Sequence, residues 1–183
     1  RNSNHESWTE DELHRFSAAR DTMTPRGPDD AGLWHQTNIL LGHRRLSILD
    51  LTQGGHQPMT SPKGTTIVFN GEIYNYRELR EQLSHEGISF RSSSDTEVLL
   101  ACFDQWGLER TLNKIRGMYA FCIWDSENQC VHLARDPIGK KPLFFFNNGK
   151  AIHFASTLKA LSKWLGPQQD YSLDATSVEN FLS

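Results

Sequence analysis

The sequence predicts an α+β fold, a four-layer α/β/β/α sandwich of two antiparallel sheets. The strand-like segments of the second half are separated by the short connections "SENQ", "PIGK" and "NNGK", which are typical of antiparallel hairpins. In the segment at 118–125, "MYAFCIWD", successive residues point to opposite faces, and both faces are apolar. A sheet with one solvent-facing side would alternate apolar with polar residues. Each sheet is therefore expected to pack against the other on one face and to carry helices on its outer face.

Periodicity and turn residues define the elements in order. Thr9 and Glu12 have the spacing of a capping box and start the first helix, and Gly87 closes the second. Asp95 is the predicted N-cap of the third, and Asn70-Gly71 the predicted turn after a buried strand. In chain order we expect a helix at 9–23, two strands within 31–48 joined at 36–38, a long irregular loop at 50–64, a strand at 67–69, helices at 76–85, 96–106 and 108–115, strands at 118–125, 130–136, 141–146 and 151–156, and helices at 158–165 and 177–182.

Composition excludes several classes of function. The chain has 183 residues and a net charge of -3, which argues against a nucleic-acid binder or a membrane-surface binder. Its apolar runs are too short to cross a bilayer. The three cysteines show no CxxC spacing, so we expect small buried hydrophobes in a reducing cytoplasm. The eight histidines form no HxxxH or HExxH pair, and we expect no metal site.

Polar residues gather where the predicted strands end. Asn70 offers an amide donor and Gly71 an unobstructed backbone N–H, a pair that can form an oxyanion hole. Arg45 can hold a carboxylate, and Glu72 and Asp95 can hold an ammonium group. Each feature also has a plainer interpretation: an ordinary turn, a helix cap or a solvated arginine. Together they describe a site for a free α-amino acid with a reactive side-chain amide.

Seven motifs in order carry a family resemblance: RGPDD, GHRRLSILDL, GGHQPM, FNGEIYNYRELR, SDTEVLL, RGMYAFCIWD and ARDPIGKKPLFF. From about Leu13 to Ser156 the chain resembles the class II glutamine amidotransferase domain of asparagine-synthetase-like proteins. The resemblance implies the N-terminal nucleophile hydrolase type of sandwich. It also implies hydrolysis of glutamine to glutamate and ammonia, which a C-terminal ATP-dependent synthetase domain then uses.

The resemblance assigns a role to each site residue. Arg45 matches the arginine that binds the glutamine α-carboxylate, and Leu49 matches a residue that offers its carbonyl to the α-amino group. Asn70 and Gly71 match the oxyanion pair. Glu72 and Asp95 match the acidic residues around the α-amino group. The implied partners are glutamine and the synthetase domain, and a homodimer is left open. No cofactor is expected here; ATP and Mg²⁺ belong to the synthetase domain.

The chain departs from the family in its nucleophile. The family uses an N-terminal cysteine whose own α-amine acts as the base, whereas this sequence begins Arg1-Asn2-Ser3. We expect roughly 5–15 residues, one strand and a turn, to be absent, and the chain alone to be inactive. Pro25 also stands where relatives carry histidine.

Two further expectations concern the organisation of the chain. The predicted domains are 1–156, an amidotransferase domain without its first strand, and 157–183, a helical lead into an absent C-terminal synthetase domain. The rival prediction is a non-catalytic scaffold domain like that of β-lactam-synthetase-like proteins.

Overall fold

The structure is a computed structural model that describes residues 7–167. Its helices and strands follow one another as α1 (Glu10–Arg20), η1 (Asp21–Arg26), β1 (Asp30–Gln36), β2 (Ile39–Arg45), η2 (Gln53–Gly55), β3 (Met59–Thr60), β4 (Thr66–Ile73), α2 (Tyr76–His85), α3 (Asp95–Lys114), β5 (Gly117–Asp125), β6 (Cys130–Arg135), β7 (Phe144–Asn147), β8 (Ile152–Ala155) and α4 (Leu158–Leu165). No helix within this part of the chain combines the length and apolarity that a membrane crossing needs. The predicted helix at 177–182 lies outside the described residues.

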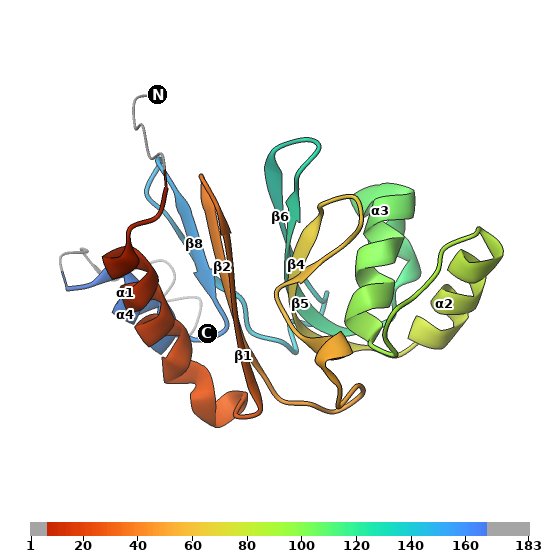
Figure 1. The fold of residues 1–183 in the computed structure, drawn as a ribbon, viewed down its shortest axis with the longest axis horizontal. Helices are drawn as coiled ribbons and strands as arrows, with labels where there is room; N and C mark the ends of the chain where they lie inside the picture. Colours follow the sequence, from red (N-terminus) through yellow and green to blue (C-terminus); the bar gives the residue numbers. More distant parts are fainter. Residues whose placement is uncertain (1–6, 168–183) are drawn as a thin grey trace, which may run out of the picture.

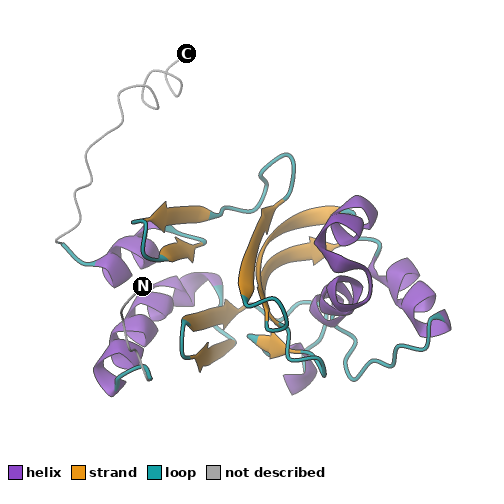
Figure 2. Ribbon diagram, turned by 90° about the horizontal axis from the view of Figure 1, so that it is seen from above, coloured by secondary structure: helices purple, strands orange, loops and turns teal. Residues whose placement is uncertain are grey.

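The elements form four layers, as predicted (Figure 1). Helices α2 and α3 cover one face of a four-stranded sheet with the order β3-β4-β5-β6. The hairpins β1–β2 and β7–β8 form the second strand layer, and α1 and α4 cover its outer face (Figure 2). Every strand pair in these layers is antiparallel. The difference from the prediction is that the second layer consists of two separate ladders within residues 7–167, rather than one continuous sheet.

Strand β5 separates two apolar cores, as its two apolar faces predict. Tyr119, Phe121 and Ile123 pack with residues of α2 and α3 on one side. Cys122 and Trp124 pack with residues of β2 and β4 between the two strand layers. The alternation of side chains along the strand thus assigns one face to each core.

Three predictions about element boundaries were wrong or incomplete. Asn70 and Gly71 do not form a turn, because β4 continues through them to Ile73 while β5 runs alongside. Ser94, and not Asp95, is the N-cap of α3, since its hydroxyl accepts a hydrogen bond from the Thr96 N–H at 3.1 Å. The helices expected at 96–106 and 108–115 are two parts of α3, divided at Gly107 by a φ of 73°.

The ends of the helical layer match the sequence signals. The capping box of α1 forms, with the Thr9 N–H donating to Glu12 Oε2 at 2.9 Å. Helix α4 was assigned to the lead into a further domain, yet it packs against α1 and β8. Phe16 and Trp164 join the two helices edge to face, with ring centroids 5.4 Å apart. The predicted boundary at residue 156 stays a prediction.

Candidate active site

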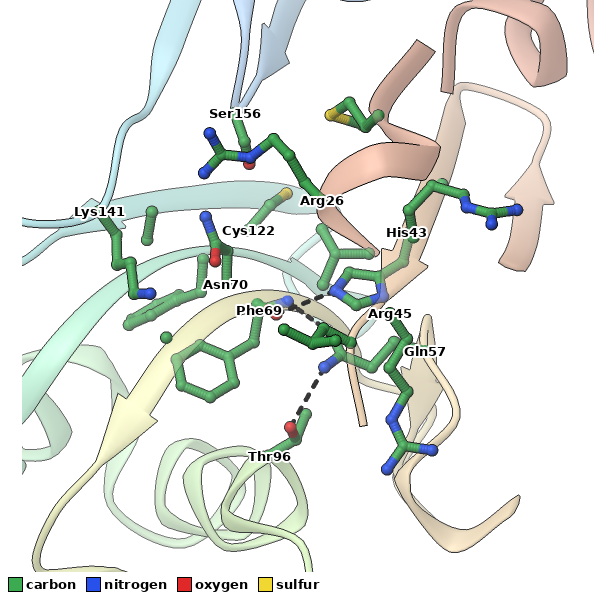
Figure 3. A pocket seen from close by; sticks show the side chains of 18 of the residues that line it. Arg26, His43, Arg45, Gln57, Phe69, Asn70, Thr96, Cys122, Lys141 and Ser156 are labelled. Carbon is green, nitrogen blue, oxygen red and sulfur yellow. Dashed lines mark hydrogen bonds between the residues drawn. The ribbon is translucent and has the colours of Figure 1, made fainter. Parts of the chain in front are cut away.

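One pocket of about 500 Å³ opens between the two strand layers. Its walls come from β2 and the loop after it, from β4 and β5, and from the first turn of α3. In Figure 3 the Asn70 side chain lies on the same side of β4 as Cys122 and Lys141. The six site residues predicted from the sequence all line this pocket: Arg45, Leu49, Asn70, Gly71, Glu72 and Asp95.

The backbone of Gly71 presents a free N–H at the edge of β4. Tyr119, its partner on β5, exchanges hydrogen bonds with Asp136 on the far side of β5, the Asp136 N–H donating to Tyr119 O at 2.8 Å. Two facing residues of an antiparallel pair either direct their N–H and C=O groups at each other or both direct them away from each other. Since the groups of Tyr119 point away from β4, the N–H of Gly71 points away from β5. Strand β3 pairs only with Thr66 and Ile67, so it does not reach Gly71. Among the described residues nothing accepts this N–H, which leaves it available to a bound oxyanion.

Side chains occupy the same edge on either side of Gly71. The Phe69 N–H donates to Gln57 Oε1 at 2.7 Å, and the Phe69 carbonyl accepts from His43 Nε2 at 3.1 Å. Further along, the Ile73 N–H donates to Asp95 Oδ2 at 3.0 Å. Gln57 also donates to Thr96 Oγ1 at 3.2 Å, which ties β4 to the start of α3 (Figure 3). These contacts fix the backbone of β4 around the one N–H that they leave open.

Packing requires glycine at position 71. A Cβ there would meet the backbone of Met118 and Tyr119 and the ring of Phe69. The neighbouring Asn70 side chain makes no hydrogen bond with the described residues, so its amide is free to act as the second donor. The roles of the two residues in catalysis stay predictions.

The Glu72 carboxylate affects the neighbouring carboxyl group of Asp95. Asp95 is 5% exposed, and burial, with the negative charge of Glu72 adding to it, raises the pKa of Asp95. Hydrogen bonds from the Ile73 and Thr96 N–H groups act in the opposite direction but do not cancel the effect. A cation bound between Glu72 and Asp95 would relieve their repulsion, as expected for an α-ammonium site.

Arg45 lies at the other end of the pocket and holds the loop that follows β2. Its guanidinium donates to the carbonyl of Thr52 at 3.0 Å and to the carbonyl of Asp50. In Figure 3 the side chain extends away from Asn70. An arginine has five N–H groups, so three remain for a ligand carboxylate.

The Asp50 carboxylate connects this loop to the residues before α3. It accepts from the Thr52 hydroxyl at 2.6 Å and from the Ser93 N–H at 2.9 Å. The Thr52 hydroxyl and the N–H groups of Thr52 and Ser93 lower the pKa of Asp50 to about 2, against the opposing effect of burial. The hydrogen bonds of Asp50 thereby connect the loop that Arg45 contacts to the segment that precedes Asp95.

Several polar residues of the pocket were not among the predicted site residues, among them His43, Gln57, Arg26 and Lys141. Gln57 and His43 hold the backbone before Asn70 through contacts that join residues 12 and 26 positions apart. The available signal was a polar residue inside an apolar strand, as in "ILLGHRR". Burial lowers the pKa of His43 to about 4, so the ring is neutral and its Nε2 donates to the carbonyl.

Comparison with known proteins decides the family. The model of the glutamine amidotransferase domain family matches residues 4–183. The chain belongs to this family. Asparagine synthetase [glutamine-hydrolyzing] 1 of Bacillus subtilis is 40% identical over 176 residues, which cover 96% of this chain and 27% of that protein. Asparagine synthetase B [glutamine-hydrolyzing] of Escherichia coli is 36% identical over 140 residues, 76% of this chain and 25% of that protein. The chain therefore spans about a quarter of the length of these curated relatives.

Two solved structures share the fold. The glutamine phosphoribosylpyrophosphate amidotransferase from B. subtilis, complexed with ADP and GMP, superposes with a TM-score of 0.64. It is 23% identical and covers 84% of this chain and 39% of its own. A structure described as the allosteric regulatory enzyme of purine biosynthesis gives a TM-score of 0.54 at 29% identity, over 68% of this chain and 29% of its own. The predicted N-terminal nucleophile hydrolase sandwich is thus confirmed.

Proposed function

We propose that this domain hydrolyses the side-chain amide of glutamine and supplies ammonia within an asparagine-synthetase-like protein. The observation that carries the proposal is the convergence of three kinds of group on one pocket. Asn70 and Gly71 provide two donors, Arg45 a cation, and Glu72 and Asp95 two anions. A free amino acid with a side-chain amide presents the complementary oxygen, carboxylate and ammonium groups. The curated relatives, whose names describe glutamine-hydrolysing synthetases, support the same conclusion.

The reaction adds water to glutamine and releases glutamate and ammonia. A thiolate attacks the amide carbon, and the carbonyl oxygen becomes an oxyanion that the Asn70 amide and the Gly71 N–H stabilise. The C–N bond then breaks, ammonia leaves with a proton, and water cleaves the thioester to give glutamate. The resemblance assigns the thiol to an N-terminal cysteine with its own α-amine as base.

The cysteines in the described part of the chain do not fit this role. Burial raises the pKa of the Cys102 thiol to about 12 and also raises that of Cys122. Cys122 lines the pocket but is fully buried, and Cys130 does not line the pocket. A mid-chain cysteine also has no free α-amine to act as base. We therefore propose the N-terminal thiol, and we propose ATP and Mg²⁺ only for the synthetase part.

Calorimetric titration with three ligands tests the proposal. L-Glutamine carries both charged groups, glutaramate lacks the ammonium group, and 4-aminobutanamide lacks the carboxylate. Each missing charge-assisted contact should weaken binding by about 1.5–3 kcal/mol. If the folded chain does not bind L-glutamine, or if it binds all three ligands equally, the proposed function is wrong.

A further inference from the structure

A second cluster of reactive side chains lies at the far end of β5, on the β5–β6 hairpin. Asp125 closes β5, and Cys130 and His132 lie two residues apart on β6. Asp125 and Cys130 are direct cross-strand partners. Residues i and i+2 of a strand share a face, and facing residues of a pair share it too, so all three side chains project from the same face of the sheet. None of the three lines the glutamine pocket.

The donor atoms of this cluster converge on a small volume. Cys130 Sγ lies 3.4 Å from His132 Nε2, and Asp125 Oδ2 lies 3.8 Å from the same nitrogen. One donor atom from each residue lies within 4.8 Å of the other two. A tetrahedral zinc ion, with a Zn–S bond of about 2.3 Å and a Zn–N bond of about 2.0–2.1 Å, separates those donors by roughly 3.5 Å. The sulfur and nitrogen already have that separation, and the carboxylate needs to close by less than about 1.5 Å.

Two of the three ligands, Asp125 and His132, are held in place by contacts outside the cluster. Asp125 is 8% exposed, and its Oδ2 accepts from Asn128 Nδ2 at 2.8 Å, while its Oδ1 accepts from the Glu127 and Asn128 N–H groups. Each carboxylate oxygen has two lone pairs, so Oδ2 keeps one for a metal. The His132 ring packs against Phe103 of α3, with centroids 5.4 Å apart. Such outer contacts are what orients ligands in protein metal sites.

We propose that Asp125, Cys130 and His132 bind a single divalent transition-metal ion of the Zn²⁺ type. Thiolate and imidazole donors select this class over Mg²⁺ and Ca²⁺, which prefer an all-oxygen site. One thiolate and one carboxylate neutralise the two positive charges of the ion. Three protein ligands leave a fourth tetrahedral position for water. The ion fastens the end of β5 to β6 and is independent of glutamine hydrolysis.

Binding of the ion changes one proton. A free cysteine thiol has an ordinary pKa of about 8.5, so a thiol that binds as the thiolate has to release its proton when the metal arrives. When the metal binds, the S–H bond breaks, the sulfur keeps the electron pair and bonds the metal, and the proton passes to solvent. His132 contributes the lone pair of Nε2 and keeps its proton on Nδ1.

Sequence patterns could not show this cluster. The CxxC and HxxxH motifs detect metal ligands that lie on loops and helices. This cluster instead combines residues i and i+2 of one strand with a residue of the neighbouring strand. The expectation that all three cysteines are small buried hydrophobes also fails for Cys130, which is partly exposed near the start of the edge strand β6.

Titration of the reduced chain with Co²⁺ tests the proposal. The wild type should bind one ion with a thiolate-to-cobalt charge-transfer band and the visible bands of a tetrahedral site, and Zn²⁺ should displace the cobalt. Cys130→Ser and His132→Gln should each lower the affinity for the metal at least about 10-fold. Removing a residue that only supports a ligand already costs about 10- to 100-fold, and removing a ligand itself should cost no less. Cys130→Ser should also lose the charge-transfer band. His35→Gln, at an exposed position on β1, is the matched control and should bind as the wild type does.

Thermal unfolding gives a second readout. A saturating 100-fold excess of Zn²⁺ over Kd should raise the Tm of the wild type by about 5–10 °C and leave Cys130→Ser unchanged. If Cys130→Ser melts early without metal, His132→Gln, which keeps the thiol, decides the question. The proposal is overturned if the wild type shows no saturable 1:1 thiolate band, or if the band persists in Cys130→Ser. The glutamine titrations use another pocket, so the two proposals fail separately.

Discussion

Replacing Gln57 with leucine should destabilise the domain far more than its position in a loop indicates. The side chain is 6% exposed and makes two hydrogen bonds, with the Phe69 N–H and with Thr96 Oγ1. Leucine has a similar volume but no polar atoms. The change leaves the buried Phe69 N–H without an acceptor, at a cost of about 1–3 kcal/mol, and removes a second hydrogen bond that contributes about 0.5–1.5 kcal/mol.

The two costs sum to about 1.5–4.5 kcal/mol in the free energy of unfolding, which lowers Tm by roughly 3–18 °C in a chain of this size. Urea denaturation and thermal melting both measure the effect. Gln53→Leu is the matched control because Gln53 is exposed in the same loop, and it should change stability by less than about 0.5 kcal/mol. If Gln57→Leu and Gln53→Leu unfold at the same urea concentration, the argument that Gln57 holds the edge of β4 is refuted.

Three further predictions concern β4 and its neighbours. In the intact protein, Asn70→Ala should lower kcat for glutamine hydrolysis by about 10²–10³ with little change in KM, because one oxyanion donor is lost; steady-state kinetics with near-normal turnover would contradict this. Gly71→Ala should cost about 1–3 kcal/mol or more, since the new Cβ meets the backbone of β5, and denaturation indistinguishable from wild type would show that the strands have room. Because the pKa of His43 falls from 6.5 in the unfolded chain to about 4 in the fold, only the unfolded chain binds this proton in between. Stability should therefore fall by about 3 kcal/mol as pH drops from 6.5 to about 4, and His43→Gln should remove that part of the slope; parallel wild-type and variant profiles would contradict it.

Local signals predicted most of the fold. The capping box at Thr9, the two apolar faces of 118–125 and the hairpin connections "SENQ" and "NNGK" each depend on residues close together in sequence. They were sufficient for the layer order and for most of the helices and strands. They missed β3, which lies in the loop expected at 50–64, and they wrongly treated "PIGK" as a hairpin connection, because β6 and β7 belong to different sheets. Asn70-Gly71 misled the prediction because a turn signal is local, whereas the strand is extended by pairing with Ala120 and Tyr119, which are distant in sequence.

The candidate site likewise contains residues that the sequence predicted and residues that it did not. The residues that would contact a ligand stand in recognisable motifs, and the structure brings them to one pocket. The residues that hold the backbone in place were not predicted, because Gln57 and His43 act through contacts with Phe69 that no sequence period encodes. Asp95 was misread as a cap because "SSSD" offers four adjacent candidates, and only the fold shows that Asp95 faces Ile73 while Ser94 caps.

The adjacent residues Arg44 and Arg45 have different expected roles: Arg44 is structural, and Arg45 is the proposed ligand-binding residue. The Arg44 guanidinium donates to the Gly27 carbonyl at 2.9 Å and lies 3.5 Å from the Asp21 carboxylate, so it holds the chain before β1. Arg45 faces the loop at 50–52 and retains three N–H groups. Arg44→Ala should therefore lower stability but leave glutamine affinity unchanged. Arg45→Lys should lose affinity, because an ammonium cannot copy the planar fork.

We propose that Arg45 binds the carboxylate of glutamine in this pocket, and a four-way calorimetric titration distinguishes this role from a purely structural one. The wild type and Arg45→Ala are each titrated with L-glutamine and with 4-aminobutanamide, which lacks only the carboxylate. Arg45→Ala should weaken L-glutamine binding by about 1.5–3 kcal/mol, roughly 10- to 150-fold in Kd, and barely alter the binding of 4-aminobutanamide. If Arg45→Ala weakens both ligands equally, the arginine only holds its loop, and the proposed recognition of glutamine is contradicted.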